Sequence, residues 1–287
     1  MNPLDFLLEP LGYDFMVRAL LTSVLAATVC ALLSCWLVLI GWSLMGDAVS
    51  HAVLPGVVLA YVVGAPFALG AIVFGVLAVV LIGAVRSPGR IREDAAIGIV
   101  FTVLFALGLV LISVTPSQTD LAHIVFGNIL GVSTADLVQV AILAVVAIAV
   151  LLVKRRDLTL YAFDPTHAHA IGLSPRLLGA VLLGLLAVTA VVALQVVGVV
   201  LVVALLIIPG ATAFLLTERF GRMLVIAPVT AAASAVTGLY LSYWLDVASG
   251  GMIVLVQGIL FSLAFLFAPR HGVVARLAAR RSRVTAP

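Results

Sequence analysis

Charged residues are scarce in this sequence: Asp, Glu, Lys and Arg make up 9% of its 287 residues, while apolar residues make up 64%. A soluble domain has about 25% charged and about 45 to 50% apolar residues. The mean hydropathy of +1.35 therefore excludes a soluble globular protein. Because one membrane crossing takes about 20 apolar residues, we expect a single polytopic membrane domain, 1–287, with little sequence left for a domain outside the bilayer.

Several motifs of enzyme chemistry are also missing. Lys154 is the only lysine and no G-x-x-x-x-G-K-[ST] phosphate loop is present, so the chain is not expected to hydrolyse ATP itself. H-E-x-x-H, G-x-S-x-G and C-x-x-C are absent too, which leaves hydrolase and redox functions without support. The chain is therefore not expected to be an enzyme. Its net charge of +3 is too small to indicate a nucleic-acid partner.

Cysteine is nearly absent. Cys30 and Cys35 both lie in the first apolar stretch, five positions apart, and so point to different sides of a helix. Packing is favoured over a disulfide or a metal-binding pair. Residues 1–15 lack the features of a signal peptide, so the apolar stretch after them is expected to remain as a membrane span.

Long apolar stretches are abundant. Windows of about 20 residues locate nine of them, at 17–39, 47–64, 67–85, 95–113, 137–153, 177–194, 197–216, 223–245 and 252–267. The boundary near Gln195 and Gly198 divides a run of about forty residues, twice the length of one crossing. The sequence predicts an all-α membrane protein with about nine transmembrane helices, eight being the alternative count.

Basic residues predict the orientation, because they concentrate in short cytoplasmic loops. They follow the third, fifth and seventh stretches and fill the tail, whereas segments 117–136 and 246–250 have none. This pattern places the N-terminal segment 1–15 outside and the tail 270–287 in the cytoplasm. Segment 120–131 is apolar but too short to cross, so a re-entrant or interfacial helix is expected there on the outer side.

An aspartate and a histidine form the most informative pair. Asp47 and His51 lie four residues apart at the start of the second stretch, so on a helix they project from one face. Ionisable residues inside a span mark functional sites, and a carboxylate with an imidazole suits manganese, iron or zinc. The alternative is structural, with Asp47 as the N-cap of the second helix and His51 bonded to nearby backbone.

Two ligands do not fill the shell of such an ion, which takes about four to six donors. A second copy of the chain would supply the others, placing two Asp and two His around one ion. Small residues near the pair would let helices approach closely, although packing within one subunit explains them equally well; they are Gly41, Gly46, Ala48, Ala52 and Gly56.

The longest polar insert, 154–176, has the signals of a short exposed helix. Asp164 is a typical N-cap, Pro165 suits the first helical position, and Gly172 suits the end. His167 and His169 are two apart and do not share a helix face. Docking of a soluble partner is therefore favoured over metal binding.

Four segments together resemble the permease subunits of the manganese, zinc and iron ABC importers. They are SLMGDAVSHAVLPGVVLAY (43–61), VFGNILGVS (125–133), VVGVVLVVALLIIPGATAFLL (196–216) and LDVASGGMIVLV (245–256). The match extends over essentially the whole chain. One departure is Gly210, where relatives often have alanine after the proline.

The resemblance implies a function and partners. In such importers a homodimer of permeases works with two cytoplasmic ATPase subunits in the bacterial plasma membrane, and an extracellular binding protein delivers the metal. No permanently bound cofactor is implied, since the metal is the transported substrate. Manganese is favoured over zinc by the FGNILGVS segment and the absence of a His-rich loop, and iron is a further option.

The resemblance also implies roles for particular residues. Asp47 and His51, in their G-D-A-x-S-H context, would line the metal pathway. The helix that couples the permease to its ATPase would lie within 163–173. Its coupling residues would be Phe163, Asp164, Pro165, Ala168, Ala170, Gly172 and Leu173.

A transporter driven by an ion gradient, without an ATPase, is the alternative in a different class. Such carriers usually have intramembrane acids at matched positions of two repeated halves, whereas Asp47 is the only clear one here. A structural or channel-like subunit would tolerate the loss of Asp47 and His51.

Overall fold

The computed structural model describes residues 9–65, 67–86, 92–115, 129–268 and 272–274. Within these ranges the chain is helical and contains no strand. The helices, in chain order, are η1 Glu9–Gly12, α2 Asp14–Ile40, α3 Ser43–Ala52, α4 Leu54–Val63, α5 Phe67–Arg86, α6 Glu93–Val114, η2 Ile129–Gly131, α8 Thr134–Val153, α9 Arg155–Phe163, α10 Pro165–Ala170, α11 Pro175–Val197, α12 Val199–Leu216, α13 Phe220–Leu245 and α14 Ser249–Phe267.

Eight helical segments in the described part of the chain are long and apolar enough to cross a membrane, with α3 and α4 counted as one segment, Ser43–Val63. α5 adds a further apolar helix. Its 20 residues are about 30 Å long, which matches the hydrocarbon core of a bilayer. The all-α, polytopic prediction is confirmed, and each of the nine apolar stretches corresponds to one helical segment.

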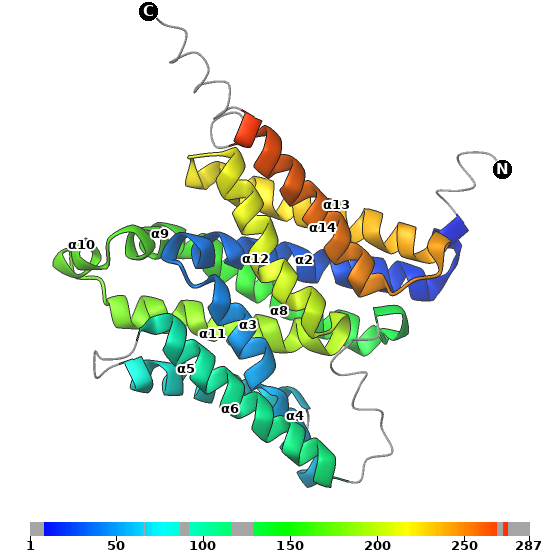
Figure 1. Cartoon of the computed structure of the whole chain (residues 1–287), viewed down its shortest axis with the longest axis horizontal. Helices are drawn as coiled ribbons and strands as arrows, with labels where there is room; N and C mark the ends of the chain where they lie inside the picture. The colour runs from blue at the N-terminus through cyan, green and yellow to red at the C-terminus, as the bar shows by residue number, and fades with distance from the viewer. Residues whose placement is uncertain (1–8, 66, 87–91, 116–128, 269–271, 275–287) are drawn as a thin grey trace, which may run out of the picture.

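The predicted division of the long apolar run is confirmed at Gly198. This residue separates α11 from α12 and has φ 80° and ψ 163°, a conformation that glycine adopts readily and other residues rarely do. Beyond it, α12 runs back toward the end of the bundle where α9 and α10 lie (Figure 1). The run therefore forms two helices.

α2 is the central helix of one part of the bundle. α12 and α13 pack along it, α8 packs on it as well, and all residues from Val29 to Leu37 are buried. Both cysteines lie in this buried segment and are free thiols. The Cys35 thiol donates a 3.6 Å hydrogen bond to the backbone oxygen of Met223 on α13. The packing role predicted for the cysteines is therefore confirmed.

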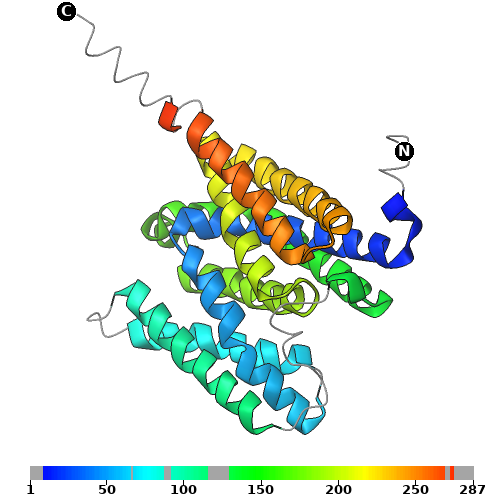
Figure 2. The same ribbon diagram turned by 45° about the vertical axis from the view of Figure 1, so that its right-hand side comes forward.

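α3, α4, α5 and α6 form a second group, which lies below the others in Figure 2 and contacts them through α11 and α12. α4 and α5 approach closely because Gly56 faces Gly70 backbone to backbone, with no room for a Cβ on either residue. Small residues of this kind let membrane helices pack tightly. This group positions the candidate site.

Three expectations fall on residues outside the described ranges. The outer helix predicted at 120–131 is described only in its last turn, the 3-10 helix η2. Residues 1–8 of the N-terminal segment and nearly all of the tail 270–287 also lie outside. The orientation assigned to both ends therefore stays a prediction.

Candidate functional site

The second membrane segment is broken immediately after the predicted metal ligands. α3 ends at Ala52 and α4 begins at Leu54, with Pro55 in the first turn of α4. Proline has no backbone N–H, so it cannot continue the hydrogen-bond ladder of α3. Discontinuous helices are typical of substrate sites in transporters. The sequence analysis did not predict this break, although Pro55 and Gly56 were its signals.

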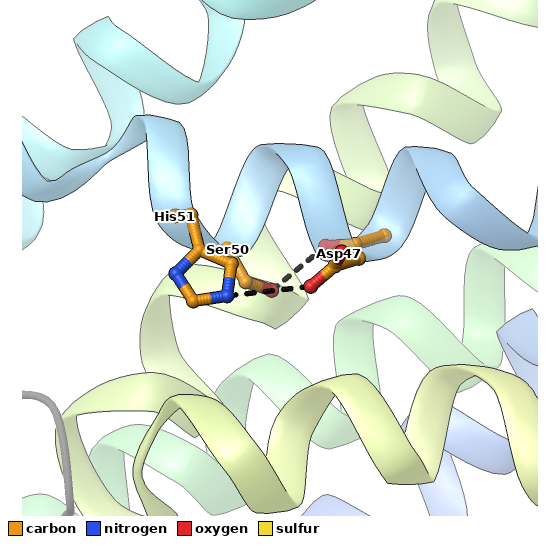
Figure 3. A network of polar contacts seen from close by, with 4 residues as sticks. Asp47, Ser50 and His51 are labelled. Carbon is orange, nitrogen blue, oxygen red and sulfur yellow. Dashed lines mark hydrogen bonds and ion pairs between the residues drawn. The ribbon is translucent and has the colours of Figure 1, made fainter. Parts of the chain in front are cut away.

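Asp47 and His51 lie on one face of α3, as predicted. Nε2 of His51 is 3.3 Å from Oδ1 of Asp47, and both side chains project from the same side of the helix (Figure 3). The Asp47 side chain is 33% exposed and the His51 side chain 24%. Both side chains therefore remain accessible within a largely apolar bundle.

The capping role considered for Asp47 is wrong. α3 begins at Ser43 with Trp42 as its N-cap, so Asp47 lies in the second turn and does not cap the helix. Nδ1 of His51 is buried and forms no hydrogen bond with any described residue. Backbone bonding by His51 is therefore not observed.

Two aromatic rings from α6 lie against the imidazole of His51. The centroids of the Phe101 and Phe105 rings lie 5.3 and 5.2 Å from that of the imidazole, and Phe105 meets it edge to face. The two phenylalanine rings also stack on each other, with a centroid separation of 6.0 Å. The apolar contacts restrict rotation of the imidazole, so its Nε2 stays beside the Asp47 carboxylate. Sequence analysis did not identify these phenylalanines.

The small residues near the pair pack within the chain. Gly46 lies against Leu206 of α12 and Gly56 against Gly70 of α5, while Ala48 and Ala52 are almost fully buried. The Ser50 hydroxyl donates to the backbone oxygen of Gly46 (2.8 Å, Figure 3). Of the two interpretations for these residues, packing inside one subunit is the one that the structure supports for all but Gly41.

One chain brings two candidate metal ligands together at this place. Among the described residues, no group of three or more His, Cys, Asp or Glu side chains comes together. In the described part of the membrane-spanning segments, Asp47 is also the only acid lying more than a turn inside its helix. Further donors for a bound ion have to come from backbone, water or a second copy.

The predicted helix in the polar insert is present as α10. Asp164 caps it by accepting a 2.9 Å hydrogen bond from the backbone N–H of His167, and Pro165 is the first helical residue. Gly172, with φ 89°, ends it, and the N–H of Leu173 bonds back to the oxygen of Ala168. This is the αL termination that favours glycine.

The candidate coupling residues differ in exposure. Phe163, Asp164, Pro165, Ala170 and Gly172 are exposed. Ala168 is fully buried, since α10 packs against α9 and α11. Leu173 is half-buried. A partner could thus contact most of the predicted residues, whereas Ala168 anchors α10 to its own chain.

Comparison with known families identifies the chain. The model of the ABC 3 transport family matches residues 12–268. The chain belongs to this family. The predicted resemblance to metal ABC importer permeases is confirmed, and the match includes both parts of the bundle and the Asp47–His51 helix.

Proteins similar in sequence to this chain are membrane proteins of metal transport systems. The chain is 50% identical to the manganese transport system membrane protein MntB of Synechocystis sp., over 96% of this chain and 90% of that protein. It is 49% identical to a probable iron transport system membrane protein of Haemophilus influenzae, over 92% of this chain and 97% of that one. The fold agrees with that of PsaBC from Streptococcus pneumoniae, solved in complex with Fab, with a TM-score of 0.86 and 37% sequence identity. The match covers 93% of this chain and 97% of that one.

Proposed function

We propose that this chain is the permease subunit of an ATP-driven importer of a divalent transition metal, with manganese as the favoured substrate. The observation that carries the proposal is the Asp47–His51 pair, 3.3 Å apart beside a helix break. Relatives named for manganese transport and for iron transport support a metal substrate. The plasma membrane of a bacterium is the proposed location.

The proposed pathway forms between two copies of the chain. Each copy contributes one carboxylate and one imidazole, and a two-fold axis that passes beside α3 would bring both pairs around one ion. Two carboxylates balance the charge of a divalent ion, which lowers the cost of holding it within a membrane. Oxygen and nitrogen donors without sulfur suit manganese and iron(II), whereas copper(I) would favour thiolate or thioether.

The proposed partners act at the two ends of the bundle. A cytoplasmic ATPase would dock on α10, which protrudes from the end of the bundle that also carries α9 (Figure 1) and is mostly exposed. ATP hydrolysis would occur in that subunit. An extracellular binding protein would deliver the metal at the opposite end, where α13 turns into α14.

Loss of either ligand tests the proposal. Asp47→Ala and His51→Ala should reduce manganese accumulation to background in cells that lack other uptake systems, because each removes one of few ligands. Membrane abundance should stay normal, since both side chains are partly exposed. Asp94→Ala, at the exposed start of α6, is the matched control and should transport normally. Wild-type accumulation by both ligand variants at normal abundance would remove the pair from the pathway.

A further inference from the structure

A basic groove lies at the end of the bundle that carries α9, away from the Asp47–His51 pair. Its volume is about 580 Å³, and it is enclosed by α9 and the first turn of α13. Arg155, Arg156 and Phe163 line it from α9, and Phe220 and Gly221 line it from α13. The groove therefore combines two cations with two aromatic rings.

The arginines of the groove have no anionic partner in the described part of the chain. Neither the Arg155 nor the Arg156 side chain forms a hydrogen bond or ion pair with a described residue. The acid on α9, Asp157, is instead 3.4 Å from Nζ of Lys154. Both arginines line the groove, and guanidinium groups that are not paired with an acid are suited to binding a phosphate.

The first turn of α13 adds positive potential to the same groove. No side chain caps this helix, so the free N–H groups and the dipole of a 26-residue helix favour an anion beside Phe220 and Gly221. Nη2 of Arg155 would lie 2.9 Å from a Cβ at Gly221. The absence of a side chain at Gly221 thus lets the guanidinium lie over this turn.

An apolar strip continues from the groove along α13. Gly221, Val225 and Val229 are four residues apart, so they share one face of the helix. Val225 and Val229 are 62% and 61% exposed. An exposed apolar strip on a membrane helix is suited to an acyl chain.

We propose that this groove binds an anionic phospholipid of the cytoplasmic leaflet. Its phosphate would contact Arg155 and Arg156, and one acyl chain would follow Val225 and Val229. Basic pockets between membrane helices on the cytoplasmic side recognise such headgroups, and the concentration of arginine assigns this end to the cytoplasm. The continuous path from cations to apolar strip favours a lipid over an acidic segment of a soluble protein, which would not need the strip.

The experiment measures lipid binding to the delipidated, full-length protein in detergent by native mass spectrometry. Phosphatidylglycerol is the probe and phosphatidylcholine the zwitterionic control. Since each arginine near a membrane surface strengthens binding of anionic lipid about fivefold, Arg155→Gln combined with Arg156→Gln should weaken phosphatidylglycerol binding about 25-fold. Phosphatidylcholine binding should not change.

A matched double variant separates the groove from general charge effects. Arg92→Gln with Arg176→Gln removes the same charge from exposed positions outside the groove and should leave phosphatidylglycerol binding within about twofold of wild type. Equal losses in both double variants, or equal binding of the two lipids by the wild type, would overturn the proposal.

A photo-crosslinking amino acid at Thr159, which also lines the groove, identifies the occupant in membranes. The permease is expressed for this purpose together with the ABC ATPase subunit that is proposed as its partner. Crosslinking to phospholipid is the expected result. Crosslinking to the ATPase, or to neither, would overturn the lipid assignment while leaving the transport function intact.

Discussion

The imidazole of His51 meets the ring of Phe105 edge to face, with 5.2 Å between the ring centroids. Phe101, stacked beside Phe105 on α6, lies 5.3 Å from the imidazole. The proposed metal ligand is therefore oriented by two apolar rings, while its Nδ1 has no hydrogen-bond partner among the described residues. In most protein metal sites a hydrogen bond to the second ring nitrogen performs this orientation.

Removing one of these rings should weaken metal capture. Phe105→Ala would let the imidazole rotate away from Asp47, and we expect the apparent affinity for manganese uptake to fall about tenfold. The maximal rate at saturating manganese should change less, because both ligands remain. Uptake as a function of manganese concentration separates the two quantities.

The chain offers a matched control for this prediction. Phe261 and Phe265 form a second stacked pair on α14, with centroids 6.2 Å apart, and no imidazole ring contact involves them among the described residues. Phe261→Ala should therefore leave the manganese affinity unchanged. A similar loss of affinity in both variants would show that the rings act through general packing.

The site was only partly predictable from the sequence, for a physical reason. The spacing of Asp47 and His51 sets their shared helix face locally, so it could be predicted. The contact between His51 and Phe105 joins helices about fifty residues apart and depends on how α3 and α6 pack. The burial of Ala168 likewise depends on the packing of α10 against α9 and α11, which no local pattern encodes.

Gly210 is required for the close approach of α12 to α2. A Cβ at this position would lie 2.6 Å from Oγ and 2.7 Å from the backbone oxygen of Ser34. Gly210→Ala should therefore destabilise the protein by about 1 to 3 kcal/mol through overpacking, although alanine favours helix formation. Thermal unfolding in detergent measures the effect.

Gly258 provides the comparison. It lies within α14, and a Cβ there would have no neighbour within 4 Å, so Gly258→Ala should leave the melting temperature unchanged or raise it. A melting temperature for Gly210→Ala at or above that of wild type would mean that α2 and α12 can separate without cost.

Substitutions on α10 should separate docking from folding. Ala170 is exposed, so Ala170→Arg should preserve membrane abundance and reduce copurification of the ATPase. Ala168 is buried, so Ala168→Arg should lower the abundance of the permease itself, because burying a charge is costly. Ala170→Ser is the mild control. If the ATPase copurifies with the Ala170→Arg variant as well as with the wild type, the docking surface does not include the exposed face of α10.

The number and limits of the spans were predicted more successfully than the site. Hydropathy over about 20 residues is a local property, and the glycine that divides the run 177–216 is recognisable in the sequence. The break between α3 and α4 was missed because the 21 residues of Ser43–Val63 still form one apolar window. Hydropathy reports length and polarity, whereas the backbone break depends on Pro55.

The last prediction concerns orientation, which rests on the distribution of basic residues. Two exposed positions suit a cysteine probe: Val247 in the α13–α14 turn, which is 45% exposed, and Ile171 after α10, which is 57% exposed. Ser249 is less suitable than Val247, because it is buried and its hydroxyl lies 2.7 Å from that of Ser242. Cys30 and Cys35 are replaced by alanine so that the introduced thiol is the only one.

With α11 and α12 as separate crossings, Val247 should face outward and Ile171 the cytoplasm. A membrane-impermeant thiol reagent should therefore label Val247→Cys on intact cells and label Ile171→Cys only after permeabilisation. The background lacking cysteine is the control for nonspecific labelling. Labelling of Ile171→Cys on intact cells, with protection of Val247→Cys, would invert the orientation and place α10 where no cytoplasmic ATPase could reach it.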